Sequence, residues 1–290
     1  MKVTGMNHSP GALVTELPGD LTTASPAELD LIGAAFREYG LLVFRGRELA
    51  VEEQIAICAG VGSIIDQAGN GKGWFNITNR DGGYDGELCF HADLSHNQHL
   101  LTGASLYASV LPDGPTATIF AHTGLAYDEL PPELRSRIRG RTGLHATMRS
   151  GQARPDTPVR HIPELAEDPR AQHPLEFVHP ATGRTLLFVS DLQTERIAGM
   201  AWEESVALLD ELAGWIQQPR FVYRHEWQLH DLVVWDQIML QHSRAAESVC
   251  GERTLRRVSF THPSYAEGCQ RFFTSLGTRA GRSGTQKEVL

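Results

Sequence analysis

The chain has 290 residues and a formal net charge of −9, which argues against nucleic acid as a partner, because phosphate binding needs a positive face. Its hydrophobic content of 41% and charged content of 21% are typical of a globular protein. No run of about 18 apolar residues is present and the N-terminus has no apolar signal core, so we expect no membrane span. Four cysteines without C-x-x-C spacing favour free thiols and a cytoplasmic location: Cys58, Cys89, Cys250 and Cys269.

The N-terminal part predicts two helices around a buried strand. Ser25-Pro26-Ala27-Glu28 is a capping box with proline at the first helical position, and it opens a helix that ends near Gly40. A strand over 41–44 and a helix from about Ala50 to Cys58 follow. Residues 70–90 are rich in Gly, Asn and Asp, which predicts an irregular segment around a short strand over 75–78.

Short strands dominate the remainder of the chain. We expect a helix from Trp202 to about Ile216. The long proline-bearing stretch 146–173 is typical of a functional lid or of a disordered loop. The predicted strands lie near 103–110, 116–122, 185–190, 221–223, 231–235 and 255–261. Many short strands with supporting helices favour a β-sandwich or jelly roll.

A short motif suggests a metal site. In His91-Ala92-Asp93 the first and third residues point to the same face of a strand, so both can bind one ion. The third ligand must come from another strand, and His242 is the candidate. Two histidines and one carboxylate form the facial triad of non-haem Fe(II) oxygenases, which leaves the opposite face of the metal open.

The residues around His242 strengthen this interpretation. The run from Trp235 to Ala245 reads W-D-Q-I-M-L-Q-H-S-R-A, and Arg253 and Arg257 follow 11 and 15 residues after the histidine. A guanidinium can donate two parallel hydrogen bonds to a carboxylate. Arginines four residues apart on a strand share a face, so Arg256 should point the other way and form a surface charge.

Together these segments resemble the taurine / chlorophenoxyacetate dioxygenase family, which depends on Fe(II) and 2-oxoglutarate. Further matches are Gly40 to Gly46, Phe90 to Asp93, and the turn His179-Pro180-Ala181-Thr182-Gly183-Arg184. The resemblance implies a mainly β fold with flanking helices, a double-stranded β-helix (jelly roll). We expect one such domain over residues 1–265 and a flexible C-terminal tail over 266–290.

The resemblance also implies roles for individual residues. His91, Asp93 and His242 would bind Fe(II), while Arg253 and Thr118 would hold the distal carboxylate of 2-oxoglutarate. Arg257 would lie near its metal-bound end, and O2 is the second cosubstrate. Gly114-Pro115-Thr116-Ala117 replaces the family's double glycine before Thr118, so Thr116 stays a competitor for that role. No catalytic residue beyond the metal ligands is expected, and His96 and His99 are interpreted as loop or surface histidines.

The sequence specifies the substrate less closely than it specifies the metal ligands or the cosubstrate. Trp74, Phe75, Tyr84 and Phe90 could form an apolar wall over the site, and Asn79 stands where the family has a pocket asparagine. Plain core packing is the alternative for the aromatic residues, and a solvated loop position is the alternative for Asn79. Gln67 lies near the position of a sulfonate-binding histidine of the taurine enzyme, which makes taurine a poor candidate.

We therefore expect an Fe(II)/2-oxoglutarate-dependent dioxygenase that releases succinate and CO2 while it oxidises a small organic molecule, such as a secondary metabolite. Hydroxylation is the usual outcome, with desaturation or epoxidation as variants, and the presence of Asp93 disfavours halogenation. A catabolic hydroxylase of a small carboxylate or sulfonate is the alternative within the family. A non-catalytic metal- or 2-oxoglutarate-binding jelly-roll protein is the alternative of another class, and a homo-oligomer is left open.

Overall fold

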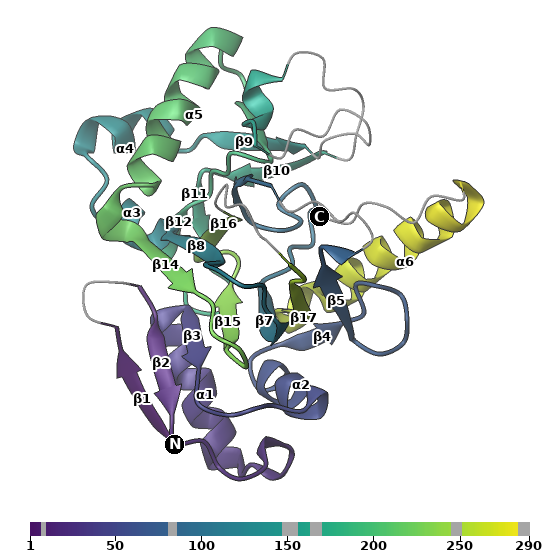
Figure 1. The fold of residues 1–290 in the computed structure, drawn as a ribbon. Helices are drawn as coiled ribbons and strands as arrows, with labels where there is room; N and C mark the ends of the chain where they lie inside the picture. Colours follow the sequence, from purple (N-terminus) through teal and green to yellow (C-terminus); the bar gives the residue numbers. More distant parts are fainter. Residues whose placement is uncertain (7–9, 81–85, 147–155, 163–169, 245–250, 284–290) are drawn as a thin grey trace.

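Two antiparallel-rich sheets form the body of the protein (Figure 1). The computed structural model describes residues 1–6, 10–80, 86–146, 156–162, 170–244 and 251–283. The larger sheet has the strand order β1 (Lys2–Gly5), β2 (Ala12–Thr15), β3 (Leu41–Phe44), β15 (Leu232–Asp236), β7 (Gly103–Val110), β17 (Thr254–Thr261) and β4 (Ser63–Ile65), and β5 (Trp74–Thr78) also pairs with β17. Its strands are antiparallel except for β2 beside β3.

The smaller sheet packs against the larger one. Its order is β14 (Val222–Glu226), β8 (Ala117–His122), β16 (Leu240–Arg244) and β6 (Leu88–His91). One buried cluster, here called the inner core, contains Val43, Leu106 and Trp235 from the larger sheet and Phe120 and Leu240 from the smaller one. The two sheets therefore share a core face to face, which confirms the jelly roll.

Strand alternation fixes what each sheet face contacts. Leu41 and Val43 belong to the inner core, whereas Leu42 and Phe44 face the opposite way, under the helices α1 (Pro26–Tyr39) and α2 (Val51–Ala59). This second cluster is called the outer core. Both hydrogen bonds of the predicted capping box at Ser25 are present, which explains where α1 begins.

A further layer covers the outer face of the smaller sheet. It holds the helices α3 (Thr123–Asp128), α4 (Pro132–Ile138) and α5 (Trp202–Ile216). It also holds the strand set β10 (Arg170–Pro174), β9 (Thr142–Ala146) and β13 (Thr194–Ile197), and the hairpin β11 (Glu176–Val178) with β12 (Thr185–Leu187). Four 3-10 turns complete the described elements: η1 (Leu21–Thr23), η3 (Val159–His161), η4 (Pro219–Phe221) and η5 (Pro263–Tyr265).

The stretch 146–173, predicted as a loop, contains a short turn that is held in place by buried contacts. Within it, η3 buries Val159 and Arg160. The Arg160 guanidinium donates to Asp191 at 2.8 Å and to Asp210 at 2.6 Å. The Asp191 backbone N–H donates to the Phe90 carbonyl of β6 at 3.0 Å. Residues 147–155 and 163–169 lie outside the described part of the chain. The stretch is therefore tied down at its centre by a buried ion pair.

The expected flexible tail is wrong over residues Ala266–Ser283, because they form the helix α6 (Figure 1). Cys269 and Phe273 are buried against Ile65, Leu94 and Leu101. Gly268 permits a close approach, since a Cβ there would meet the His99 ring at 2.2 Å. The helix forms because its apolar residues find a partner surface at β4, which the local sequence does not reveal. Among the described helices, α6 included, none is long and apolar enough to cross a membrane.

Candidate active site

The three predicted metal ligands meet on two neighbouring strands of the smaller sheet. His91 of β6 is the direct cross-strand partner of His242 of β16, and their ring centroids lie 4.0 Å apart. Asp93 follows β6, and its Oδ1 lies 3.3 Å from His91 Nε2. One ligand atom from each residue falls within 4.8 Å of the others, and all three side chains are buried. The structure thus brings together residues that are up to 151 positions apart in the sequence.

The tautomer and the charge of the two imidazoles suit metal binding. His91 Nδ1 lies 2.9 Å from the Cys89 carbonyl, which fixes that nitrogen as the donor and leaves the lone pair of Nε2 for an ion. His242 Nδ1 is buried without a hydrogen-bond partner among the described residues. Burial and the neighbouring His91 hold the pKa of His242 well below its ordinary value, so this ring is neutral at pH 7. Two imidazoles and a carboxylate with such geometry fit Fe(II).

Asp93 is ionised and held by two partners. Its Oδ2 accepts hydrogen bonds from the Arg257 guanidinium and, at 2.8 Å, from Gln237 Nε2. Burial alone would raise the pKa of Asp93, but Arg257, His242 and His91 together hold it well below its usual range. Arg257 therefore contacts the candidate metal ligand Asp93.

Arg257 is itself positioned by a polar chain. Its Nε donates to Ser259 Oγ at 3.0 Å, and that hydroxyl donates to Gln67 Oε1 at 2.6 Å. The loop of Gln67 is tied to α6 by Asp66, whose backbone N–H donates to Gln270 Oε1 at 2.9 Å. The neutral amide of Gln67 thus lies three hydrogen bonds away from the Asp93 carboxylate.

Thr118 and Arg253 lie on the inner faces of the two facing sheets. Thr118 is two residues before Phe120, an inner-core residue that pairs with His242. Arg253, which is only 7% exposed, immediately precedes β17 and alternates with Leu255 and Arg257 on the inner face. This arrangement suits a dicarboxylate that lies between the sheets and reaches the metal.

Trp227 is a residue that the sequence did not single out. Its indole Nε1 donates to Thr118 Oγ1 at 3.0 Å, so the hydroxyl of Thr118 keeps its own hydrogen for another acceptor. The ring stands edge-on to His225 at 4.5 Å between centroids. His225 in turn lies 3.3 Å from Asp231, which Arg45 binds with two donors. No local pattern marks this contact, because Trp227 and Thr118 are 109 positions apart.

Two of the predicted substrate residues face away from the site. Trp74 pairs with Val258 and packs on the outer core, and Phe90 packs on the cluster under α5. The reason is the period of two along a strand, since Phe90 directly precedes the inward-facing His91. Tyr84 lies outside the described residues.

Asn79 does not offer its amide to a pocket. Its Oδ1 accepts from the Arg253 backbone N–H at 2.8 Å, and its Nδ2 donates to the Gly251 carbonyl at 2.9 Å. Phe75 is the aromatic residue of this segment on the inner face, because it is the cross-strand partner of Arg257. Among the described aromatic candidates Trp74, Phe75 and Phe90, it is therefore the one that shares a face with Arg257.

Several histidines have structural roles, and two expectations about surface groups are wrong. His96 is buried against Phe272 at 5.9 Å between ring centroids, and burial lowers its pKa to about 4. Arg256 faces outward as predicted, yet it is half-buried: its guanidinium lies 4.3 Å from the Tyr107 ring centroid, and its Nε donates to Gln54 at 2.7 Å. His179 donates to Asp236 at 2.8 Å and so links its turn to the one before His242.

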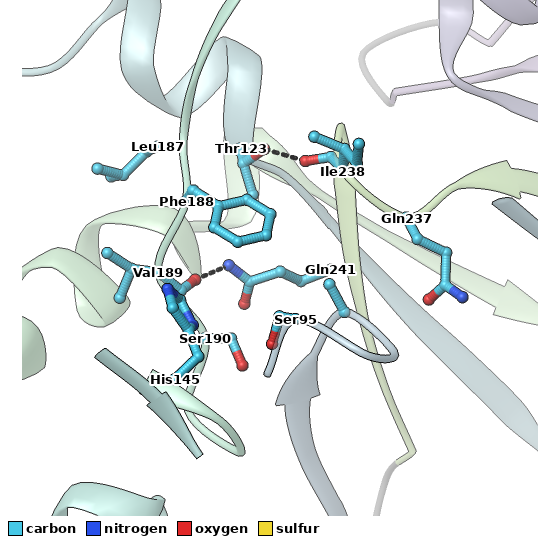
Figure 2. A pocket seen from close by; sticks show the side chains of 11 residues that line it. Ser95, Thr123, His145, Leu187, Phe188, Val189, Ser190, Gln237, Ile238 and Gln241 are labelled. Atoms are coloured by element: carbon cyan, nitrogen blue, oxygen red, sulfur yellow. Dashed lines mark hydrogen bonds between the residues drawn. The ribbon is translucent and has the colours of Figure 1, made fainter. Parts of the chain in front are cut away.

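A small cavity of about 10 Å³ lies behind the ligand strands (Figure 2). Ala92 and Gln241 line it, and both alternate with the metal ligands, so the cavity is on the other side of β6 and β16. Its remaining lining residues are Ser95, Thr123, His145, Leu187, Phe188, Val189, Ser190, Gln237 and Ile238. Figure 2 shows Gln237 at the edge of this group, apart from the other side chains. The cavity is therefore distinct from the space in front of the metal.

Comparisons with known proteins agree with this geometry. The chain is 28% identical to the 2,4-dichlorophenoxyacetate dioxygenase of Burkholderia sp. (strain RASC), over 81% of this chain and 86% of that enzyme. It is 30% identical to pentalenolactone F synthase of Streptomyces arenae, over 89% of this chain and 94% of that protein. The structure of AAD-2 in complex with Mn(II) and N-oxalylglycine matches with a TM-score of 0.75 and 25% identity, over 90% and 97% of the two chains. A family described as "Taurine catabolism dioxygenase TauD, TfdA family" matches residues 7–259, so the chain belongs to the TauD/TfdA family of dioxygenases.

Proposed function

We propose that the chain binds Fe(II) through His91, Asp93 and His242 and uses 2-oxoglutarate and O2 to hydroxylate a small organic molecule. As a member of its family the chain is a 2-oxoglutarate-dependent dioxygenase, and its relatives act on small organic molecules such as phenoxyacetates. The observation that carries the proposal is the cluster of three buried ligand atoms within 4.8 Å of one another.

The side chains around the cluster support distinct tasks. Arg253 and Thr118 would bind the distal carboxylate of 2-oxoglutarate, with Trp227 orienting the Thr118 hydroxyl. Arg257 keeps Asp93 ionised and so available to a cation. Phe120 and Trp235 of the inner core lie 6.4 Å and 5.0 Å from the His242 ring between centroids, and would shield that ligand from water. When bound, Fe(II) supplies the activation of O2 that couples oxidation of a C–H bond to the release of succinate and CO2.

The test is substrate-coupled succinate formation. Purified protein is incubated with Fe(II), 2-oxoglutarate, O2 and a panel of small apolar acids and neutral molecules, and succinate is quantified. Turnover that a panel member stimulates supports the proposal. A protein that binds metal and 2-oxoglutarate yet forms no succinate with any member would favour the non-catalytic binding protein.

We further propose that the substrate has an apolar body. Phe75 and Ile77 are the inner-face residues of β5, and Ile77 packs on the inner core. The neutral amide of Gln67 adds no charge near Arg257. These contacts favour an apolar molecule over a compact anion such as taurine.

A carboxylate on that substrate is the second candidate, because one arginine lies near the ligands. Arg244 lies on β16 two residues after His242, where the strand pairing is irregular, and its Nε donates to the Gly86 carbonyl at 2.8 Å. Matched substrate pairs distinguish the candidates: a phenoxyacetate and its carboxamide differ only in charge. Equal turnover of both supports the apolar body alone, and selective turnover of the acid supports a carboxylate substrate.

A further inference from the structure

Gln237 contacts a metal ligand through both ends of its amide. Its Oε1 accepts the Asp93 backbone N–H at 3.1 Å, and its Nε2 donates to Asp93 Oδ2 at 2.8 Å. The side chain is 1% exposed. The orientation of the amide is fixed, because a flipped amide would set its NH2 group against a backbone donor and its carbonyl against a carboxylate.

The backbone on both sides of this contact is constrained. Gln237 lies in the turn between β15 and β16, where its own N–H donates to the Thr102 carbonyl at 2.9 Å. Asp236 Oδ1 accepts the N–H groups of Ile238 and Met239, both at 2.9 Å, and closes that turn. On the other side, Leu94 follows Asp93 with φ of 59°, an unusual value for a leucine. The constrained turn at Gln237 therefore holds the strained backbone next to Asp93.

The contact leaves one carboxylate oxygen for the metal. Gln237 and Arg257 both donate to Oδ2 of Asp93, whereas Oδ1 lies 3.3 Å from His91 Nε2. Because His91 Nε2 is the nitrogen that its Cys89 contact reserves for an ion, Oδ1 is the oxygen on the metal side.

We propose that Gln237 is a positioning residue for the metal: it fixes Asp93 so that Oδ1 alone binds the ion. It also couples the strand pair that carries His242 to the segment that carries Asp93. The inference rests on the metal site of the proposed function but not on the substrate. Partners that orient a metal-binding side chain typically change metal affinity about 10- to 100-fold when they are removed.

The length of the side chain is part of the inference. Asparagine at position 237 would be shorter by about 1.5 Å, one carbon–carbon bond. It could then keep one of the two contacts to Asp93 but not both. The glutamine is thus matched to this particular distance between its turn and Asp93.

The test measures Mn(II) binding to the metal-free protein by electron paramagnetic resonance of the free ion. Gln237→Leu should weaken Mn(II) binding about 10- to 100-fold, and Gln237→Asn should give a smaller loss in the same direction. The matched control is Gln54→Leu: Gln54 is also fully buried and donates to Ser105 Oγ and the Arg256 carbonyl, but on the outer core. It should lower the thermal midpoint of the metal-free protein and leave Mn(II) affinity unchanged.

The outcomes distinguish the positioning role of Gln237 from the metal site itself. Wild-type affinity in both Gln237 variants would overturn the positioning role, and so would an equal loss of affinity in Gln54→Leu. If Gln237→Leu fails to fold, Gln237→Asn decides by the same criterion. A wild-type protein that binds no Mn(II) would overturn the proposed function and this inference with it.

Discussion

Asn79 holds the backbone of Arg253 from both sides. The Asn79 carboxamide oxygen accepts the Arg253 N–H at 2.8 Å, and the Asn79 N–H donates to the Arg253 carbonyl at 3.2 Å. A third bond, from Asn79 Nδ2 to the Gly251 carbonyl, fixes the residues that lead into β17. The residue expected to line a substrate pocket instead positions the arginine proposed to bind 2-oxoglutarate.

Asn79→Ala should therefore weaken 2-oxoglutarate binding and leave the KM for the primary substrate nearly unchanged. The loss of hydrogen bonds worth about 1 kcal/mol each predicts a rise of about 5- to 30-fold in the KM for 2-oxoglutarate. Steady-state kinetics with each substrate varied in turn check this. A rise in the primary-substrate KM alone would restore the pocket role of Asn79.

Arg253→Ala should have a larger effect on the cosubstrate. Hydrogen bonds to a charged group contribute roughly 1.5–3 kcal/mol, so the KM for 2-oxoglutarate should rise at least about 10-fold. Arg256→Ala is the control on the opposite face: it removes the contacts to Tyr107 and Gln54 and should lower the thermal midpoint only. Similar titrations of both variants with 2-oxoglutarate would show that the inner face of β17 is assigned wrongly.

Removal of a metal ligand should abolish turnover. Asp93→Ala and His242→Ala each leave two protein ligands, and no other His, Cys, Asp or Glu among the described residues joins their cluster. Substrate-coupled succinate formation should fall to background in both, with Mn(II) affinity as the second measurement. Turnover near that of the wild type in either variant would disprove the triad.

Phe75 and Trp74 are neighbouring aromatic residues on opposite faces of β5, so their alanine variants test which face contacts the substrate. Phe75→Ala should change the KM or kcat for the primary substrate, because this ring lies on the inner face opposite Arg257. Trp74→Ala should cost stability, since it removes a ring from the outer core, and leave the kinetics of the remaining folded enzyme unchanged. Kinetics and chemical denaturation of both variants measure the two effects. Altered kinetics in Trp74→Ala with unchanged kinetics in Phe75→Ala would show that the register of β5 is assigned wrongly.

Acid should destabilise the fold partly through His122. This buried residue accepts the N–H groups of Gly124 and Leu125 at the start of α3, and burial, followed by Arg184, lowers its pKa from 6.5 to about 4. The unfolded chain takes up the proton at higher pH than the folded chain, so stability falls as the pH drops from 6.5 towards 4. At pH 5 this amounts to about 2 kcal/mol.

His122→Asn keeps an acceptor at the helix start but does not titrate. Its free energy of unfolding should therefore fall less between pH 7.5 and pH 5 than that of the wild type. Urea denaturation at both pH values measures the difference. Parallel losses in the two proteins would show that His122 does not contribute.

The sequence by itself determined the parts of the site that depend on spacing. His91 and Asp93 are two residues apart, and Arg253 and Arg257 are four apart, so the period of a strand alone sets which face each pair shares. The capping box at Ser25 and the alternation of β3 also follow from local rules, and the structure has both. The motif around His242 was sufficient to predict the family and with it the jelly roll.

Only the tertiary structure decided which distant residues support that site. Gln237 reaches Asp93 across 144 positions, and Trp227 reaches Thr118 across 109, so neither contact leaves a local pattern. The same holds for α6, whose buried Phe273 is stabilised by β4 and not by the helix itself. Trp74 and Phe90 were misassigned because composition shows that a segment is aromatic, whereas strand pairing decides which of its side chains face the metal.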